Sequence, residues 1–261
     1  MQPNEVSGGN AAVMPGEILS PSQTSCFLNC SAKYRFRYVL GLPDPAGGGA
    51  ARGKAVHKAI EYYMKATISG ITLDAQAIDD YWDEIWDEAA EGALFAANEN
   101  IEQLNQSGRD LSYKYLSEVA PAIRPAAAEL PVTGTISGVA VRGIVDILDV
   151  DGRVIDIKTS SRRSSKISGD HALQLATYVA LAGEKASGKA RIDSLVSTKD
   201  PQLVQIEHEP GRRGRQLVET MYPLVAEGIA NGLFIPNRAS TLCGYCPYKA
   251  ECASEYGGSP E

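Results

Sequence analysis

The segment GRVIDIKTS, residues 152–160, places an aspartate and a lysine two residues apart in a run of β-branched residues. Because a strand alternates its faces, Asp156 and Lys158 point to one side, whereas Ile155 and Ile157 point to the other. Burying a carboxylate and an ammonium group is costly unless they are paired or bind an ion. The pattern therefore indicates either a structural salt bridge or part of a cation site.

A second carboxylate belongs to the same segment of chain. Asp146 ends the apolar stretch GIVD, ten residues before Asp156, and the turn DVDG lies between them. An antiparallel hairpin of that length brings both carboxylates to one end of a sheet. Two carboxylates can hold Mg²⁺ or Mn²⁺, which lowers the pKa of a bound water. Lys158 can orient that water or stabilise charge that develops on a phosphodiester.

The cysteines form a separate pattern at the two ends of the chain. An odd number of cysteines, with no secretory signal expected at the N-terminus, argues against a disulfide framework and for metal binding. The C-terminal three have the spacing C-x2-C-x5-C, which by itself favours zinc with a fourth thiolate from elsewhere. We interpret Cys26 as a small buried apolar residue. The five are Cys26, Cys30, Cys243, Cys246 and Cys252.

Hydrophobic periodicity predicts the elements that position these residues. Ser20 and Pro21 open a helix that continues to the breaker sequence GLPDP at 41–45, and a glycine-rich loop leads into the next helix. Two more helices are expected at 74–98 and 109–127. Three consecutive strands are expected within 128–160, followed by a helix at 168–183, strands at 190–199 and 202–210, and a helix at 211–232.

Charge is unevenly distributed along the 261 residues. The net charge of −7 counts mildly against nucleic-acid binding as a bulk property. Basic stretches nevertheless allow a nucleic-acid channel, the alternative being ordinary solvated surface charge. No segment has the roughly 20 apolar residues of a membrane span, and we expect a cytoplasmic protein. The basic stretches are KYRFR (33–37), RGKAVHK (52–58), KTSSRRSSK (158–166) and GRRGR (211–215).

The central motifs resemble a known family. GIVDILDVDGRVIDIKTS followed by HALQLATYVAL is similar to the core of the PD-(D/E)XK nuclease superfamily, in its RecB-like branch. This resemblance implies a restriction-endonuclease-like α/β fold, with a mixed central sheet flanked by helices. It also implies that Asp146, Asp156 and Lys158 are catalytic. Gln174 and Tyr178 share one face of the following helix, which in such nucleases faces the DNA and the active site.

The N-terminal block LSPSQTSC to ARGKAVHKAIE also resembles the family. The resemblance implies that His57 binds the catalytic Mn²⁺ or Mg²⁺ together with Asp146, Asp156 and the Ile157 carbonyl. Glu61 lies one turn after His57 and could support the site.

Two positions depart from the family pattern, since Ser31 and Val145 replace prolines; neither change removes a functional side chain. Whether Glu129 joins the metal site is left open by the sequence.

The resemblance extends to the cysteines. In AddB-type and Cas-four-type relatives, one N-terminal and three C-terminal cysteines hold a [4Fe-4S] cluster, which implies that role for Cys30, Cys243, Cys246 and Cys252. Such ligation would tie the first helix to the last segment. The layout is most like the CRISPR-associated Cas-four exonucleases. That likeness implies a DNA substrate, single-stranded or with an overhang, and the CRISPR integrase complex as a partner in prespacer processing.

We therefore expect a lead at 1–17, a helical part at 18–127, a nuclease core at 128–235 and a cysteine-rich segment at 236–261. The chain lacks a G-x-x-x-x-G-K-[ST] phosphate loop, which favours a freestanding nuclease over a helicase fusion. Three alternatives stay open at this stage. They are a phage or recombination nuclease unrelated to CRISPR, a noncatalytic DNA-binding scaffold of the same fold, and a structural protein clasped by zinc.

Overall fold

The computed structural model describes residues 17–258, so the expected lead lies almost entirely outside it. A six-stranded mixed sheet forms the centre, in the order β1-β3-β4-β5-β6, with β2 paired to β3. β1 and β3 are parallel, as are β4 and β5, whereas the other pairs are antiparallel. The expected mixed α/β fold is confirmed. The strands are β1 (Ile18–Leu19), β2 (Pro125–Ile136), β3 (Val139–Asp149), β4 (Val154–Ser160), β5 (Ala190–Val196) and β6 (Gln202–His208).

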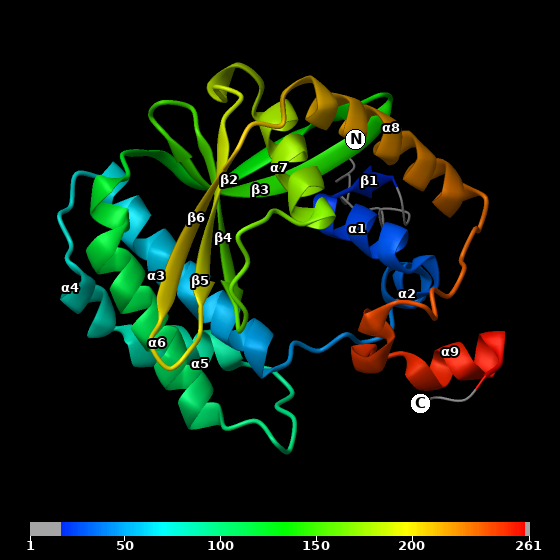
Figure 1. Cartoon of the computed structure of the whole chain (residues 1–261), viewed down its shortest axis with the longest axis horizontal. Helices are drawn as coiled ribbons and strands as arrows, with labels where there is room; N and C mark the ends of the chain where they lie inside the picture. The colour runs from blue at the N-terminus through cyan, green and yellow to red at the C-terminus, as the bar shows by residue number, and fades with distance from the viewer. Residues whose placement is uncertain (1–16, 259–261) are drawn as a thin grey trace, which may run out of the picture.

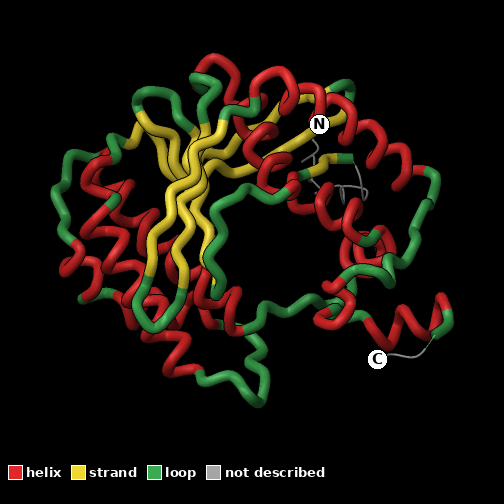
Figure 2. Tube along the Cα trace, viewed as in Figure 1, coloured by secondary structure: helices red, strands yellow, loops and turns green. Residues whose placement is uncertain are grey.

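Helices cover both faces of the sheet (Figures 1 and 2). α3, α5 and α6 share one hydrophobic cluster with Ile155 and Ile157 of β4, whereas Val154 packs on the other face against α7. The alternation expected for β4 is thus confirmed. The longer helices are α1 (Pro21–Asn29), α3 (Gly48–Ile68), α5 (Trp82–Ala90), α6 (Ile101–Glu118), α7 (Gly169–Ala182), α8 (Gly211–Ala230) and α9 (Lys249–Tyr256). The shorter ones are α2 (Ser31–Tyr34), η1 (Arg35–Val39), α4 (Ala75–Asp79), η2 (Ala120–Ala122), η3 (Gly183–Lys185) and η4 (Thr241–Tyr245).

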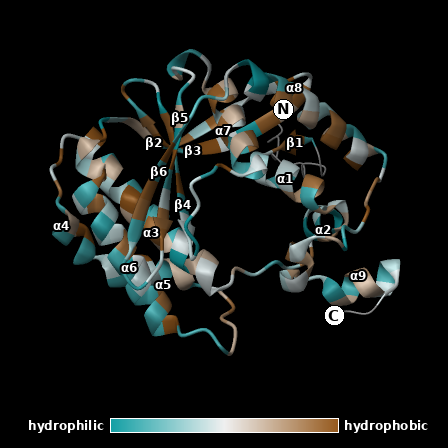
Figure 3. Cartoon of the chain, in the orientation of Figure 1, coloured by the Kyte–Doolittle hydropathy of each residue, from teal (hydrophilic) through white to brown (hydrophobic). Residues whose placement is uncertain are grey.

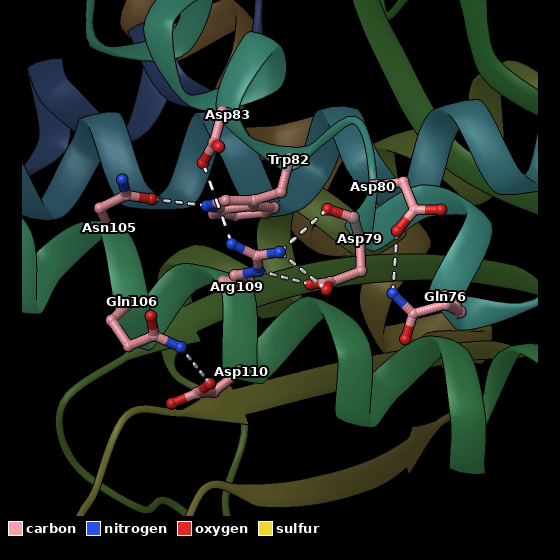
Figure 4. A network of polar contacts seen from close by, with 9 residues as sticks. All are labelled: Gln76, Asp79, Asp80, Trp82, Asp83, Asn105, Gln106, Arg109 and Asp110. Atoms are coloured by element: carbon pink, nitrogen blue, oxygen red, sulfur yellow. Dashed lines mark hydrogen bonds and ion pairs between the residues drawn. The ribbon is translucent and has the colours of Figure 1, made fainter.

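The helices before the sheet differ from expectation. The single helix predicted at 74–98 is two shorter helices, α4 and α5, and α6 begins at Ile101 rather than near 109. Asn100 caps α6 by accepting a hydrogen bond from the Gln103 N–H. Figure 4 shows how Arg109 of α6 then bridges Asp79, at the end of α4, and Asp83 of α5.

The first helix is also interrupted. Ser20 caps α1 as expected, accepting from the Gln23 N–H. The chain then leaves the helical conformation at Cys30, whose φ is −164°, before α2 begins. The prediction of one continuous helix is therefore wrong at this point. The break turns the Cys30 side chain toward the C-terminal segment, because the Asn237 N–H donates to its Sγ at 3.4 Å.

Hydropathy follows this layering (Figure 3). Apolar residues concentrate in the sheet and on the helix faces turned toward it, whereas the outer faces of α4, α5 and α6 are hydrophilic. In α5, Trp82, Ile85 and Trp86 are buried while the acidic residues between them face solvent. The aromatic stripe of α5 is therefore core packing. Among the described helices, none has the length and apolarity that a bilayer span demands.

Candidate metal centre and cysteine cavity

Three acidic residues lie level with one another on β2, β3 and β4. The antiparallel register on both sides of Glu129 sets it opposite Asp146. The last backbone pair of β3 and β4 joins Ile147 to Ile155, and the next pair in that register would join Asp146 to Asp156. Directly opposite residues of an antiparallel sheet face the same side. The hairpin expected from the sequence is formed, and its register sets Asp146 and Asp156 on the same face of the sheet.

β3 and β4 separate at this level, and the Asp146 carboxylate lies in the fork. Its Oδ2 accepts a hydrogen bond of 2.6 Å from the Ile157 backbone N–H. The carboxylate thus satisfies a donor that would otherwise lose its partner where the ladder ends. This hydrogen bond across the gap between β3 and β4 holds the Asp146 carboxylate in one orientation.

α3 contributes a histidine to the same place. His57 Nδ1 lies 3.7 Å from Asp146 Oδ2, which is too long for a hydrogen bond. One ligand atom each of His57, Glu129 and Asp146 lie within 4.8 Å of one another. Burial lowers the pKa of His57, and the Lys158 charge lowers it further. The imidazole is therefore neutral near pH 7, which is the form that binds metals.

Glu129 is the site residue whose role the sequence left open. Its φ is +49°, a left-handed conformation that is uncommon outside glycine and is found at functional positions. Burial raises the pKa of Glu129, and Asp146 and Glu61 raise it further. A divalent cation would relieve this crowding of carboxylates. The structure thus places Glu129 with His57 and Asp146.

A signal for Glu129 was present in the sequence. Ser137 and Gly138 both have positive φ, 47° and 85°, as a two-residue type I′ hairpin requires. Such a turn pairs Ile136 with Val139, and counting back along both strands sets Glu129 opposite Asp146. Recognising the turn type would have identified the third acid.

Asp156 and Lys158 pair with each other in the structure. Lys158 Nζ lies 3.1 Å and 2.9 Å from the two carboxylate oxygens of Asp156, which is 1% exposed. Asp156 is close enough to raise the pKa of Asp146, although burial is the larger cause. Asp156 lies outside the group of three within 4.8 Å, so its role as a metal ligand stays a prediction. The same holds for the Ile157 carbonyl, although a backbone hydrogen bond joins Ile157 to His57.

The expected pair on α7 is formed, but its two members differ in exposure. Gln174 Nε2 donates to the Tyr178 hydroxyl at 2.9 Å. Tyr178 is only 6% exposed and packs against Gly143 of β3, where an added Cβ would lie 2.6 Å from its ring. Direct contact of the Tyr178 ring with DNA is thus not favoured by its burial. Its hydroxyl lies near the acids, since they raise its pKa, so Tyr178 orients Gln174.

Two further residues lie close to the centre. Glu61 pairs with Lys65, and it also raises the pKa of Glu129, in agreement with a supporting position. His171, in the first turn of α7, is half-buried. Its pKa is lowered by burial and by Lys158 and raised by Asp156, so it lies beside that pair. Sequence reasoning did not single out His171, because a histidine at a helix start carries no distinctive spacing.

The cysteines of the two chain ends meet in space. A cavity of about 410 Å³ is lined by α2, the segment after α8, η4 and α9. Four of the five cysteines line this cavity together, namely Cys30, Cys243, Cys246 and Cys252. The pKa of the Cys252 thiol is raised by burial and, to a smaller extent, by the three other thiols.

Ser31 and Cys26 have structural roles beside this cavity. The Ser31 hydroxyl accepts from the Ile235 N–H at 2.7 Å, so the serine that replaces a proline ties α2 to the C-terminal segment. Cys26 packs against a hydrophobic cluster to which α7 and α8 contribute most of the buried residues. Burial raises the pKa of Cys26 to about 11, so its thiol stays protonated and is a poor ligand. The interpretation of Cys26 as an apolar residue agrees with this environment.

Comparison with known proteins identifies the family. The family model described as the PD-(D/E)XK nuclease superfamily matches residues 18–253. A solved structure named "Putative exonuclease" from Eubacterium rectale is similar, with a TM-score of 0.56, 15% identity and coverage of 93% of this chain and 94% of that one. A second, SSO0001, has a TM-score of 0.45 and 15% identity, covering 94% and 89%. No curated protein matches. The chain belongs to the PD-(D/E)XK nuclease superfamily.

Proposed function

We propose that this protein is a metal-dependent DNA nuclease that acts on strand ends. One observation carries the proposal: His57, Glu129 and Asp146 offer a nitrogen and two carboxylates within 4.8 Å, in a member of a nuclease superfamily. Oxygen and imidazole donors suit Mn²⁺, and Mg²⁺ suits the carboxylates. Asp156 and Lys158 lie alongside.

Each residue has a distinct part in the proposed reaction. A bound divalent ion would supply an activated water and offset the charge on the phosphate. Asp146 is held for ligation by the Ile157 N–H, and His57 is kept neutral by burial. Lys158 is fixed by Asp156, so its ammonium group can position the attacking water or stabilise the negative charge on the oxygens of the pentacoordinate phosphorus. Gln174, oriented by Tyr178, would contact the DNA strand.

The test is cleavage of end-labelled single-stranded and duplex DNA with Mn²⁺, and with EDTA in its place. We expect Asp156→Ala and Lys158→Ala each to abolish cleavage, by at least about 100-fold, as for loss of a transition-state donor. Asp151→Ala and Lys185→Ala, two exposed surface changes, are the matched controls. Unchanged cleavage by both site variants, in preparations free of other nucleases, would remove the proposal.

Action on strand ends is supported by the resemblance to end-trimming nucleases, and the similar structure from Eubacterium rectale bears the name exonuclease. A circular single-stranded DNA of matched length tests it. An exonuclease degrades the linear form and leaves the circle intact. Equal rates on the two forms would indicate an endonuclease.

We extend the proposal to a [4Fe-4S] cluster held by Cys30, Cys243, Cys246 and Cys252. A tetrahedral zinc site with Zn–S bonds of about 2.3 Å needs sulfur atoms about 3.8 Å apart. Within residues 17–258, no three cysteine sulfurs lie within 4.8 Å of one another, and the four surround a cavity instead. This spacing supports a group larger than one ion. It would join α2 to the last segment and so contribute to folding.

Absorbance and elemental analysis of anaerobically purified protein test the cluster. A broad band near 400 nm with about four iron atoms per chain is expected, and Cys252→Ser should remove it. Cys26→Ser, outside the proposed ligand set, should keep the band. A colourless protein that contains zinc would overturn the cluster assignment without affecting the nuclease proposal.

For the biological setting, we propose prespacer processing during CRISPR adaptation, because the layout of motifs resembles the Cas-four exonucleases. The alternative is a phage or recombination nuclease. Co-purification with a CRISPR integrase encoded nearby would favour the first, and its absence from the neighbouring genes would favour the second. DNA cleavage in the assay above would dismiss the noncatalytic scaffold.

A further inference from the structure

The segment that connects β4 to α7, residues 161–168, starts and finishes beside the candidate metal centre. It leaves β4 just after Lys158 and enters α7 just before His171. His171 is close enough to Lys158 for the lysine charge to lower its pKa. In Figure 1 this connection runs from the end of β4 to α7, on the side of β4 that is turned toward α1. Whatever it binds is therefore held next to the site.

This connection carries unpaired positive charge. Arg162, Arg163 and Lys166 are exposed, and the chain has no acidic residue between Lys158 and Asp170. None of the three takes part in an ion pair with any residue of the described range 17–258. Many other cations of the surface do pair, as Arg35 does with Glu255 and Arg124 with Asp151. In a protein of net charge −7, these three free cations lie on the connection between β4 and α7, which carry Lys158 and His171.

The backbone of the connection is held by its own serines. The Ser160 hydroxyl donates to the Arg162 carbonyl at 2.6 Å, and the Ser164 hydroxyl donates to the Lys166 carbonyl at 2.8 Å. The same two hydroxyls accept from the Arg162 and Lys166 N–H groups. These turns reduce the ordering that ligand binding would require.

The opposite side of the site is unfavourable for a phosphate chain. A groove of about 490 Å³ lies between α3 and α5, and it contains three glutamates and two lysines. Both lysines are neutralised, Lys58 by Glu88 and Lys65 by Glu61. A polyanion crossing this groove would meet net negative charge. The two sides of the centre therefore differ in sign.

We propose that Arg162, Arg163 and Lys166 bind the backbone phosphates of the DNA strand and bring it to the metal centre from the β4–α7 side. This inference rests on the proposed nuclease function and specifies the path of its substrate. The three residues bind phosphates without reading bases, so their contribution is independent of sequence and is weakened by salt. They position the strand and take no part in bond breaking.

The proposal predicts how steeply the affinity for single-stranded DNA falls with salt concentration. For single strands, the logarithm of the binding constant falls with the logarithm of salt concentration by about 0.7 for each phosphate contact. Three lost contacts should flatten the slope by about 2. Between 50 and 200 mM KCl the wild type should then lose about 20-fold more affinity than the variant R162A/R163A/K166A.

The experiment measures fluorescence anisotropy of 5′-fluorescein dT20 in EDTA, which prevents metal-dependent cleavage. The matched control is R212A/R213A/R215A, which removes three exposed charges at the start of α8. The first turn of α8 packs against Ala176 in the middle of α7, and Arg215 shares a cavity with Gly183 at the far end of that helix. Seven residues of helix, about 10 Å, separate Ala176 from the start of α7, so the control lies away from the β4–α7 connection. Its slope should match the wild type, as should that of the charge-preserving R162K/R163K/K166R.

Two results would overturn the inference: an unchanged slope for R162A/R163A/K166A, or equal flattening by the control. Circular dichroism melting checks that the variants are folded, which their exposed positions favour. With Mn²⁺ at low salt and saturating DNA, the variant should retain its maximal cleavage rate while its KM rises. Failure of the proposed function looks different, because wild-type protein would then not cleave DNA with Mn²⁺, whatever the salt dependence of its binding.

Discussion

Asp146→Asn should stabilise the metal-free protein while removing its activity. Burial and the neighbouring Asp156 raise the pKa of Asp146 from 3.8 to about 7. A carboxyl group whose folded pKa is raised opposes folding at pH values above its unfolded pKa. The unfavourable contribution of Asp146 to the free energy of folding is absent below about pH 4, grows from there to pH 7, and is constant above. Asparagine has nearly the same shape and keeps an oxygen that can accept from the Ile157 N–H.

The magnitude follows from the shift. The pKa of Asp146 rises from 3.8 to about 7, and each pKa unit corresponds to 1.36 kcal/mol. Ionised Asp146 therefore lowers the free energy of unfolding by at most about 4 kcal/mol. In Asp146→Asn, the charge-assisted hydrogen bond from the Ile157 N–H becomes a neutral one, which reduces the expected gain in stability by about 1 kcal/mol. We therefore expect Asp146→Asn to raise the free energy of unfolding by about 3 kcal/mol at pH 8 in EDTA, and by almost nothing at pH 4.

Urea denaturation followed by circular dichroism, at several pH values, measures this difference. Asp149→Asn is the control on the same strand, because Asp149 caps the β3–β4 turn by accepting from the Asp151 and Arg153 N–H groups. It should leave stability unchanged or lower it. Mn²⁺ should stabilise the wild type and not Asp146→Asn, since only the wild type keeps the full ligand set. An Asp146→Asn protein less stable than wild type at pH 8 would refute the reasoning.

Three other predictions concern buried hydrogen bonds and packing. Tyr115→Phe removes a 2.7 Å hydrogen bond to the buried Asp193 carboxylate, so the free energy of unfolding should fall by about 1.5–3 kcal/mol in urea melts; a change below 0.5 kcal/mol would contradict this. Gly143→Ala places a Cβ 2.6 Å from the Tyr178 ring, so the free energy of unfolding should fall by about 1–3 kcal/mol. Cleavage should also slow, because displacement of Tyr178 shifts Gln174. Unaltered cleavage would show that the position of Tyr178 does not affect the site. Ser31→Ala removes the bond to the Ile235 N–H, and unfolding should lose about 1 kcal/mol, whereas the absorbance near 400 nm should persist.

The elements that follow strong local patterns were predicted well. The three consecutive strands, α7 and α8 appear where alternation or helical periodicity indicated them, because their buried residues recur with the period of the element. The helices before the sheet were less predictable. At the α4–α5 interruption, Arg109 of α6 pairs with Asp79 and Asp83 on its two sides, and at the α1–α2 interruption Cys30 contacts the C-terminal segment. Neither contact is visible in hydrophobic periodicity.

The candidate site divides in the same way. By itself the sequence determined the kinds of residue, namely the D-x-K strand, the preceding aspartate and the cysteine spacing, because those are local patterns. Only the tertiary structure decided which side chains meet. It brought His57 from α3 and Glu129 from β2 to Asp146, and it buried the Tyr178 ring while its hydroxyl accepts from Gln174. Register and packing decide these contacts, since they depend on residues far apart in the chain whose distances no local pattern encodes.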